Sequence, residues 1–220
     1  MAIKTAAPGL PCRDLNRQMS LTTGDEKHRS AATSTLDALW VPHHRVLRVT
    51  PATVDDPEPD RLLLSKGHGP MAYYAVLVAD GFFDEAPLPG FGGYDSPPGH
   101  DPDRLLGPGA EIGSGSLRHG LPPTAGSVPG LRAQGLTDPR AWILVGDAEL
   151  DEGSNREATA HAGPAGLDQL HTLVIDNASE AAGWSVRTVD GRDHEALYAA
   201  CTARHPGRPH TVIAHVAPKS

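Results

Sequence analysis

Helical and extended hydrophobic patterns alternate along this chain of 220 residues. In the first half, apolar residues recur at helical spacing in STLDALWVPHHRVLRV (34–49) as far as Pro42, and again in GPMAYYAVLVADGFF (69–83) as far as Gly81. Proline and glycine are unfavourable inside a helix, so each is expected to mark a helix end. These stretches are therefore predicted to be two helices.

Short apolar runs alternate with further helical patterns in the second half. The predicted strands are AWILVGD (141–147), LHTLVIDN (170–177), WSVRTVDG (184–191) and PHTVIAHVA (209–217), and the predicted helices are DEGSNREATAHAG (151–163) and DHEALYAACTARH (193–205). Strands that are apolar on both faces and separated by helices are typical of a parallel sheet covered on each side. The predicted fold class is α/β, with a parallel central sheet and helices on both faces.

The sequence shows no internal repeat and no linker that would divide it. Its length is that of one domain, so residues 1–220 are predicted to form a single domain, with 1–20 as a loosely ordered N-terminal extension. The segment 87–116 is dense in glycine and proline. A loop of that length inside a compact domain is usually functional or disordered.

Composition narrows the choice of partners. The formal net charge of -8, without a cluster of lysine and arginine, argues against nucleic acid as a partner. No apolar run approaches the ~18 residues of a membrane span, and Lys4 and Arg13 interrupt the start, where a signal peptide needs an apolar core. We therefore expect a cytoplasmic protein that binds neither nucleic acid nor membrane. Cys12 and Cys201 share no metal-type spacing and are expected to be free thiols.

A carboxylate stands where a buried strand is predicted to end. Asp147 closes one apolar run, and Asn177 closes the next, about thirty residues later, the length of one βαβ unit. Ligands bind beyond the carboxyl ends of the strands in open parallel sheets, so both side chains are expected at one rim. Their oxygens are suited to Mg²⁺, with phosphate oxygens completing the octahedron. On these residues alone, two interpretations remain open: a magnesium-phosphate site, or Asp147 as a cap of the following helix.

Five segments of this sequence resemble segments of transketolases, and they occur along the chain in the same order as in that family. The segments are GDAELDEGSNREA (146–158) with LVIDN (173–177), similar to the thiamine diphosphate motif; LLLSKGHGPMAYYAVLVADGFF (62–83), similar to the Ser-Lys-Gly-His segment; Gly99-His100, similar to the second Gly-His; EIGSGSLRHGL (111–121), similar to the Gly-Ser-Leu-Gly-Gln-Gly turn; and VDGRDHEAL (189–197). The similarity runs from about Leu21 to the end of the sequence. It implies the thiamine diphosphate-binding (PP-type) fold and, at this length, the N-terminal, diphosphate-binding subunit of a split transketolase.

The resemblance implies a metal and cofactor site around the first motif. Asp147, Asn177 and the backbone carbonyl of Ser179 are expected to hold Mg²⁺ against the diphosphate of thiamine diphosphate. Gly146 and Ala148, which flank the aspartate, are expected to contact the cofactor. Most relatives carry glycine where this chain has Ala148, and the added methyl group restricts the backbone and crowds the diphosphate.

The resemblance also assigns roles around the rest of the cofactor. His68 is expected near the diphosphate, Gly115 and Leu117 on the aminopyrimidine side, His28 near the thiazolium, and His100 beside the reacting carbons of the substrate. The three histidines are the candidate catalytic residues, because an imidazole whose pKa lies near the working pH suits proton transfer between hydroxyl groups.

The implied activity is the transfer of a two-carbon ketol unit from a ketose donor to an aldehyde acceptor, dependent on thiamine diphosphate and Mg²⁺. In the family, the glutamate that activates the cofactor belongs to a pyrimidine-binding domain. The resemblance therefore implies a second transketolase subunit that carries this domain, in a heterotetramer. Glu152 corresponds to a buried acid at the subunit interface, and it is counted with the cofactor-binding residues.

Several departures from the family pattern keep an alternative function open. Arg118 replaces a small residue of the turn, and the stretch after Asn177 is short. Pro129 removes a hydrogen bond from the next predicted helix and is expected to end or kink it. A non-catalytic structural or regulatory subunit with the same fold is the alternative. An NAD-binding Rossmann enzyme, suggested by the glycines of GPGAEIGSG (107–115), is excluded because Arg118 stands at the place of the third glycine.

Overall fold

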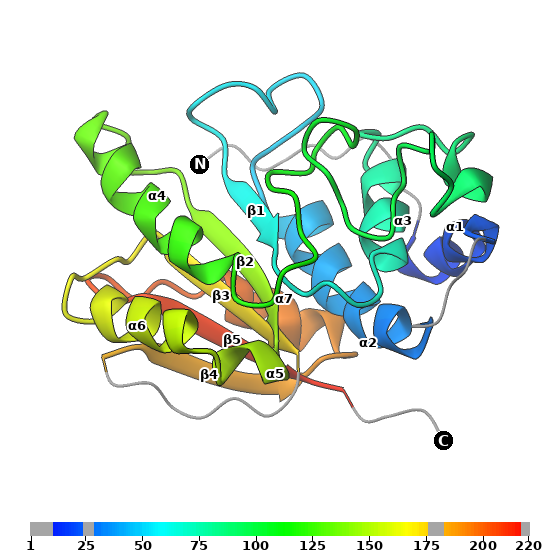
Figure 1. Ribbon diagram of the computed structural model, residues 1–220. Coiled ribbons are helices and arrows are strands. Elements are labelled where there is room, and N and C mark those ends of the chain that lie inside the picture. Colours follow the sequence, from blue (N-terminus) through cyan, green and yellow to red (C-terminus); the bar gives the residue numbers. More distant parts are fainter. Residues whose placement is uncertain (1–10, 24–28, 176–182, 217–220) are drawn as a thin grey trace.

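A parallel sheet forms the centre of the protein. The computed structural model describes residues 11–23, 29–175 and 183–216. The strands within these ranges are β1 (Arg61–Leu64), β2 (Ala141–Gly146), β3 (Leu170–Ile175), β4 (Ser185–Asp190) and β5 (His210–His215). They form one sheet in the order β1-β2-β3-β5-β4, and every described strand pair is parallel (Figure 1). The predicted α/β class and parallel sheet are confirmed.

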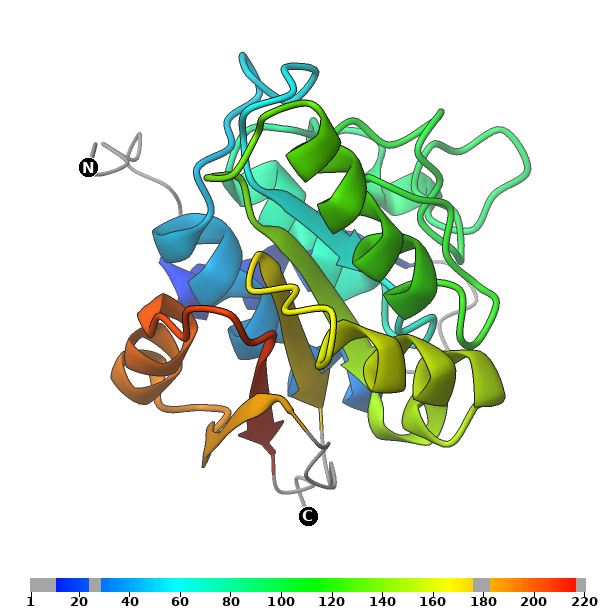
Figure 2. The same ribbon diagram turned by 90° about the vertical axis from the view of Figure 1, so that its left-hand side faces the viewer.

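Helices cover both faces of this sheet (Figure 2). One side carries α2 (Arg29–Trp40), α3 (Met71–Ala79) and α7 (His194–Thr202), with α1 (Leu15–Leu21) packed against α3, and the other carries α4 (Leu121–Ala133) and α6 (Gly153–Ala162). A first hydrophobic core lies between the sheet and α2, α3 and α7, and a second core lies between the sheet and α4 and α6. Strand side chains alternate between these cores, so Trp142 and Leu144 belong to the first core, and Ile143 and Val145 belong to the second. All four are fully buried, which explains the unbroken apolar run of β2.

The N-terminal region is more ordered than its sequence suggested. A loosely ordered extension was expected over 1–20, but a 3-10 turn, η1 (Cys12–Asp14), leads directly into α1. Leu15 is fully buried and Met19 is 3% exposed, both in the first core. The segment 12–21 therefore packs onto the domain, because α1 buries these two side chains against α3.

The two predicted helix ends have different outcomes. The α-helix α2 ends at Trp40, but the chain stays helical through Pro42 as a π-helical turn, η2 (Val41–Val46), after which the Leu47 amide donates to the Pro42 carbonyl at 2.8 Å, so Pro42 does not end the helical backbone. The predicted end at Gly81 is confirmed. Gly81 follows α3 with a φ of +78°, a left-handed conformation that favours glycine and closes a helix C-terminus.

Pro129 does not end α4, which continues to Ala133. Of the two expected outcomes, an end or a kink, the end is wrong, because α4 buries Leu121, Ala125 and Val128 in the second core, while Pro129 lies on the exposed side. Burying a valine or leucine side chain stabilises by about 1.5–3 kcal/mol. Several such contacts offset the ~3 kcal/mol cost of an interior proline.

A buried ion-pair network fixes the amino ends of β1 and β2. The carboxylate of Asp60 is fully buried and pairs with the guanidinium groups of Arg48 at 2.9 Å and Arg140 at 2.6 Å. Although burial raises the pKa of a carboxyl, hydrogen bonds from the two arginines hold the pKa of Asp60 at about 2. Asp60 therefore stays ionised and anchors β1 beside β2.

Within the described residues, no helix combines the length and apolar character needed to cross a membrane.

Candidate active site

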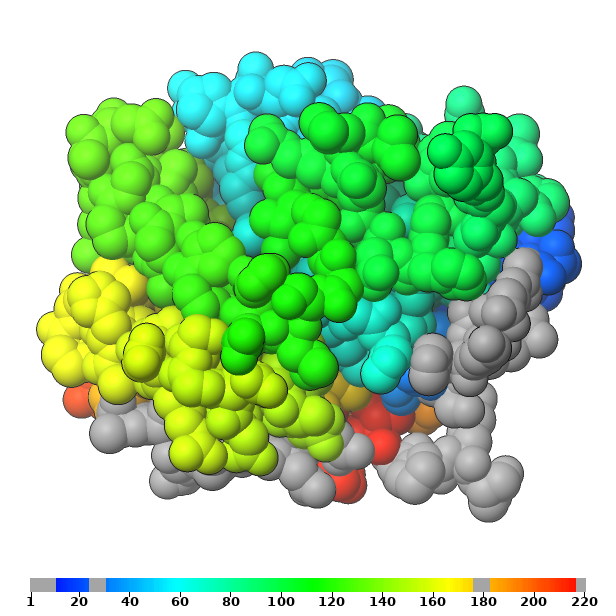
Figure 3. Space-filling model, viewed as in Figure 1, coloured from blue at the N-terminus to red at the C-terminus, as the bar shows by residue number. Residues whose placement is uncertain are grey.

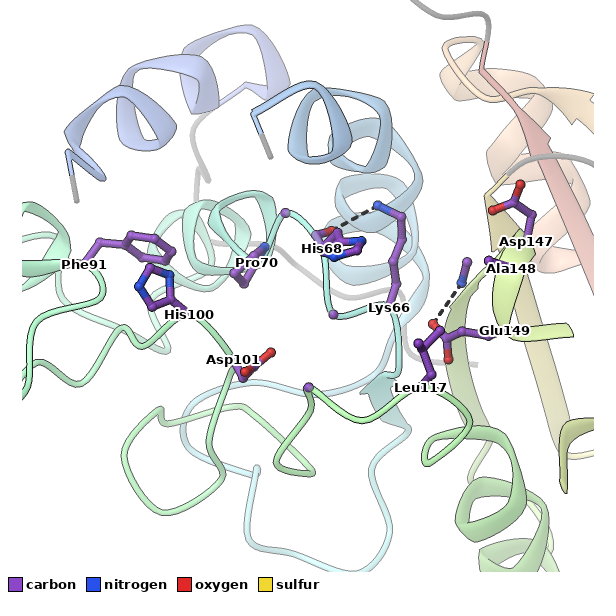
Figure 4. Close-up of a pocket in the computed structure, with 14 residues that line it drawn as sticks. Lys66, His68, Pro70, Phe91, His100, Asp101, Leu117, Asp147, Ala148 and Glu149 are labelled. Carbon is purple, nitrogen blue, oxygen red and sulfur yellow. Dashed lines mark hydrogen bonds between the residues drawn. The ribbon is translucent and has the colours of Figure 1, made fainter. Parts of the chain in front are cut away.

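A cavity of about 500 Å³ lies beyond the carboxyl ends of β1 and β2 (Figure 4). Small-molecule sites usually have about this volume, and open parallel sheets bind ligands at this edge. The cavity is lined by Lys66, Gly67, His68, Gly69, Pro70, Phe91, His100, Asp101, Gly115, Leu117, Gly146, Asp147, Ala148 and Glu149. Three separate segments of the chain therefore meet here: the turn after β1, the long loop that includes 87–116, and the turn after β2.

Most of the residues singled out in the sequence come together around this cavity. The predicted residues that line it are His68, His100, Gly115, Leu117, Gly146, Asp147 and Ala148. His28, Asn177 and Ser179 lie outside the described residues, so their predicted roles stay predictions. Glu152 does not line the cavity.

Asp147 follows β2 at the rim. It is the first residue of a short helix, α5 (Asp147–Leu150), and its side chain is exposed. The cap position of α5 belongs to Gly146, and the Asp147 side chain does not cap this helix. The interpretation of Asp147 as a helix cap therefore has no support in the geometry. The β2–β3 register pairs Gly146 with Ile175, so β3 ends at the same rim.

Glu149 joins the ends of two strands beneath the cavity. It is 2% exposed, and its carboxylate accepts hydrogen bonds from the Ser65 hydroxyl, just after β1, and from the Gly146 amide at 3.2 Å. The Gly120 amide donates to the same hydroxyl at 3.1 Å. A side chain at Gly120 would place its Cβ 2.4 Å from that of Ser65, so only glycine fits there.

Lys66 lies between the two sides of the cavity, with His68 on one side and Asp147 on the other (Figure 4). Its half-buried ammonium donates to the carbonyl of Ala31 at 3.3 Å, the hydroxyl of Thr35 at 2.9 Å and the carbonyl of His68 at 3.0 Å. These three oxygens carry no formal charge. Within the part of the chain that the structure describes, the lysine is thus oriented without a hydrogen bond to a carboxylate.

The surroundings of Lys66 lower the pKa of its ammonium group. Burial lowers the pKa of its ammonium to about 8, although the negative charges of Asp147 and Glu149 act in the opposite direction. A lysine with a pKa in this range beside a cavity is a candidate functional group. An anion bound in the cavity would favour the charged form and raise the pKa again.

The long loop forms the opposite wall. The His100 ring meets Phe91 edge to face, with centroids 5.3 Å apart. Gly115 has a φ of +109°, and a Cβ there would lie 2.5 Å from Cγ of Asp101, so glycine is required on both grounds. Near it, Arg118 has a φ of +74° and is the non-glycine residue with positive φ among those described. Glycine, which the family's Gly-Ser-Leu-Gly-Gln-Gly turn has at this place, would adopt this φ without strain, so the replacement by arginine introduces backbone strain.

Glu152 lies beside this turn. It stands at the cap position of α6, and its carboxylate contacts the Arg118 guanidinium at 3.3 Å, with the Glu152 side chain 36% exposed. The chain by itself therefore does not bury this acid. Its predicted place at a subunit interface stays a prediction.

Seven cavity residues were not singled out from the sequence: Lys66, Gly67, Gly69, Pro70, Phe91, Asp101 and Glu149. Lys66 and Glu149 stand inside the two recognised motifs, next to residues that were singled out, and that position was the available signal. Phe91 and Asp101 belong to an irregular loop, whose path no local pattern determines.

Comparisons with known proteins agree with this geometry. Residues 20–205 match the family described as "Transketolase, thiamine diphosphate binding domain". The chain is 44% identical to "Ferredoxin fas2" of Rhodococcoides fascians, over 94% of this chain and 72% of that protein. It is 33% identical to a protein of Actinobacillus succinogenes that is named as one subunit of an apulose-4-phosphate transketolase, over 86% of this chain and 75% of that protein.

The fold is also that of a solved transketolase. The structure of the enzyme from Leishmania mexicana superposes with a TM-score of 0.73 at 22% sequence identity. The match covers 94% of this chain but only 37% of that enzyme, so the chain spans little more than a third of a full-length transketolase.

Proposed function

The chain belongs to the transketolase family, as its thiamine diphosphate-binding domain, and on that basis we propose that it is one subunit of a two-polypeptide transketolase. The proposed reaction is transfer of a two-carbon ketol unit from a ketose donor to an aldehyde acceptor, with thiamine diphosphate and Mg²⁺. The observation that carries the proposal is the assembly of His68, Gly115 and Asp147 around one cavity at the carboxyl ends of β1 and β2.

The residues present fit the diphosphate of this cofactor. Asp147 offers an exposed carboxylate at the rim, a hard oxygen ligand of the kind that Mg²⁺ takes together with phosphate oxygens. Lys66 offers a positive charge that no carboxylate among the described residues neutralises by a hydrogen bond. Asn177 and the Ser179 carbonyl are proposed as the further ligands of Mg²⁺.

The cofactor, when bound, supplies the electron sink for the two-carbon fragment. The chain's own part is to orient the diphosphate and to move protons. His68 and His100 are exposed at the cavity, where an imidazole can accept or return a proton of a substrate hydroxyl. The edge-to-face contact with Phe91 orients the His100 ring. His28 is proposed as the third histidine, near the thiazolium.

A second subunit is proposed to cover the open side of the cavity. The relative from Actinobacillus succinogenes is itself named as one subunit of its transketolase. Leu117, which lines the cavity, is 57% exposed, and the loop before it exposes Leu105 (91%) and Tyr94 (102%). The loop (green) and α6 (yellow) form much of the face seen in Figure 3. The proposed partner carries the pyrimidine-binding domain with its catalytic glutamate, in a heterotetramer, with Glu152 near the boundary.

Two other functions have less support. The strained backbone of Arg118 favours a non-catalytic subunit. A non-catalytic subunit, however, would have no need for Lys66, His68, His100 and Asp147 in a single cavity, so their assembly favours an enzyme. Electron transfer of the ferredoxin type is disfavoured, because iron–sulfur clusters are held by sets of cysteine thiolates and this sequence has two cysteines.

The direct test is calorimetric titration of the chain with thiamine diphosphate, and with pyrophosphate as a probe of the diphosphate half alone, each with and without Mg²⁺. We expect saturable binding of both ligands that is at least about tenfold tighter with Mg²⁺, since an ion held by Asp147 would neutralise the charge of the phosphates. Binding of neither ligand at millimolar concentration, both with and without the partner subunit, would overturn the proposal.

Affinity for thiamine diphosphate is expected to fall as the pH rises through about 8. Below that value Lys66 keeps the proton that attracts the diphosphate, and above it the free protein loses this charge. Replacement of Lys66 by glutamine should weaken binding at neutral pH by about tenfold, the scale of one hydrogen bond to a charged group. It should also flatten the dependence between about pH 7 and pH 9.

The matched control is Arg45→Gln, which also removes one positive charge but from an exposed pair with Glu195, away from the cavity. Its titrations should keep both the affinity and the pH dependence of the original protein. If the affinity of the original protein for thiamine diphosphate did not change between about pH 7 and pH 9, this result would contradict the role given to Lys66.

A further inference from the structure

Three side chains from distant parts of the sequence meet outside the cavity. They are Cys12 of η1, Asp37 of α2 and His194, the first residue of α7. Oδ1 of Asp37 lies 3.3 Å from Sγ of Cys12 and 2.7 Å from Nε2 of His194, and the three atoms all lie within 4.8 Å of one another. None of the three residues lines the candidate active site.

The cluster is on a different face of α2 from the cavity. Thr35 points to Lys66 at the cavity, and Asp37 follows two residues later. Two residues of an α-helix correspond to a rotation of about 200°. Asp37 therefore faces η1 and α7 rather than the cavity, and the cluster is a separate feature of the protein.

The chemistry of these groups is that of a transition-metal site. Thiolate sulfur, imidazole nitrogen and carboxylate oxygen are the usual ligands of Zn²⁺, with bonds of about 2.0 to 2.3 Å. In a tetrahedron with such bonds the ligand atoms are roughly 3.4 to 3.6 Å apart. The Cys12–Asp37 separation is already 3.3 Å, and the His194–Asp37 pair needs to open from 2.7 Å. We propose that Cys12, Asp37 and His194 bind a zinc ion, with a fourth position left to water or another ligand.

Neighbouring residues hold the proposed ligands in position. The Arg192 guanidinium lies 3.5 Å from Oδ2 of Asp37 and leaves Oδ1 toward the other two groups. The indole of Trp40 lies against the His194 ring, with centroids 5.1 Å apart. Asp193 caps α7 and so fixes the backbone at His194. Such contacts orient metal ligands before the ion binds.

The charges also balance. A thiolate and a carboxylate together carry two negative charges, which Zn²⁺ neutralises. The positive charge of Arg192 repels the ion, but its guanidinium lies beside Oδ2 of Asp37, the oxygen that is not a proposed ligand. Binding displaces the protons that now join the Cys12 thiol and the His194 ring to the carboxylate. The ion would link η1 to α2 and α7, so its role is to fasten the N-terminal turn to the domain.

Cobalt(II) is the probe that identifies the ligands. The full chain, reduced and freed of metals by a chelator, is titrated with Co²⁺ and followed by absorption spectroscopy. We expect a thiolate-to-cobalt charge-transfer band and the visible bands of tetrahedral Co²⁺, both saturating at about one equivalent and both removed by Zn²⁺. A thiolate band cannot arise from Co²⁺ bound at Asp147.

Variants assign the band to this cluster. Cys12→Ser should abolish the band, and Asp37→Asn and His194→Gln should weaken Zn²⁺ binding roughly 100-fold or more, the upper range seen even for outer-shell contacts. Cys201→Ala is the matched control, because Cys201 is the other cysteine and is buried away from the cluster. It should keep the band.

Thermal unfolding gives a second, independent measurement. Zn²⁺ should raise the melting temperature of the original protein and of Cys201→Ala, and not that of Asp37→Asn, because only ions bound to the native state stabilise it. Absence of the thiolate band from the original protein at saturating Co²⁺ would overturn the proposal, and so would a band that persists in Cys12→Ser.

Discussion

Ketol transfer is expected to be undetectable with the 220-residue chain alone and to appear when the proposed second subunit is added. The cavity lies at an open face, where His100, Asp147 and Leu117 are all exposed. A site that is open to solvent cannot exclude water from a carbanion. The family resemblance also puts the activating glutamate on the pyrimidine-binding domain. The measurement is the rate of product formation from a ketose donor and an aldehyde acceptor, with thiamine diphosphate and Mg²⁺ present, for each polypeptide alone and for the mixture.

The control for this experiment is the isolated second subunit, which should also be inactive. Size-exclusion chromatography of the mixture should show that the activity elutes with a complex of both polypeptides. Turnover by the isolated chain at a rate comparable to the mixture would show that no partner is needed, although the proposed cofactor site in this chain would then still stand.

Replacement of Asp147 by alanine is expected to abolish the Mg²⁺-dependent binding of thiamine diphosphate, with an affinity loss of roughly 100-fold or more. Asp147 is the proposed metal ligand at the end of β2, and removing a carboxylate leaves the diphosphate charge poorly neutralised. The fold should be unaffected, because the side chain is exposed and caps no helix. Calorimetric titration at several Mg²⁺ concentrations measures the loss, and circular dichroism with thermal unfolding checks the fold.

The matched control is Asp151→Ala. Asp151 is an exposed acid four positions further along the same turn, and its carboxylate pairs with Arg156 at the surface. This variant removes the same group and should bind the cofactor as the original protein does. Equal affinities of Asp147→Ala and the original protein would remove Asp147 from the site.

Local sequence patterns predict the fold class of this protein, several of its strands and helices, and the edge of the sheet where the cavity lies. The unbroken apolar run of β2 predicts a strand buried on both faces, because neighbouring positions must enter different cores. Gly81 marks the end of α3 through its left-handed backbone. The motifs around His68 and Asp147 identify the family and the rim of the sheet, since the residues after parallel strands meet at one edge.

Some elements required the tertiary structure because their local pattern was ambiguous or misleading. The apolar run of β1 (Arg61–Leu64) is too short to distinguish from part of a helix. Pro129 predicted an end or a kink in α4, yet the helix does not end there, because burial of its opposite side outweighed the lost hydrogen bond. Leu15 gave no sign that η1 and α1 would be packed onto the domain.

Side-chain chemistry that depends on distant residues was decided by tertiary structure alone. The pKa of Lys66 is set by burial against α2, and Glu149 is held by Ser65, 84 residues earlier. Cys12 lies 25 residues from Asp37, which in turn lies 157 residues from His194. No spacing rule joins such positions, because the distance between them along the chain carries no information about the packing that brings them together. The sequence by itself determined the fold class and the cofactor motifs, whereas the electrostatics of the cavity and the cluster of Cys12, Asp37 and His194 exist only once the helices are packed on the sheet.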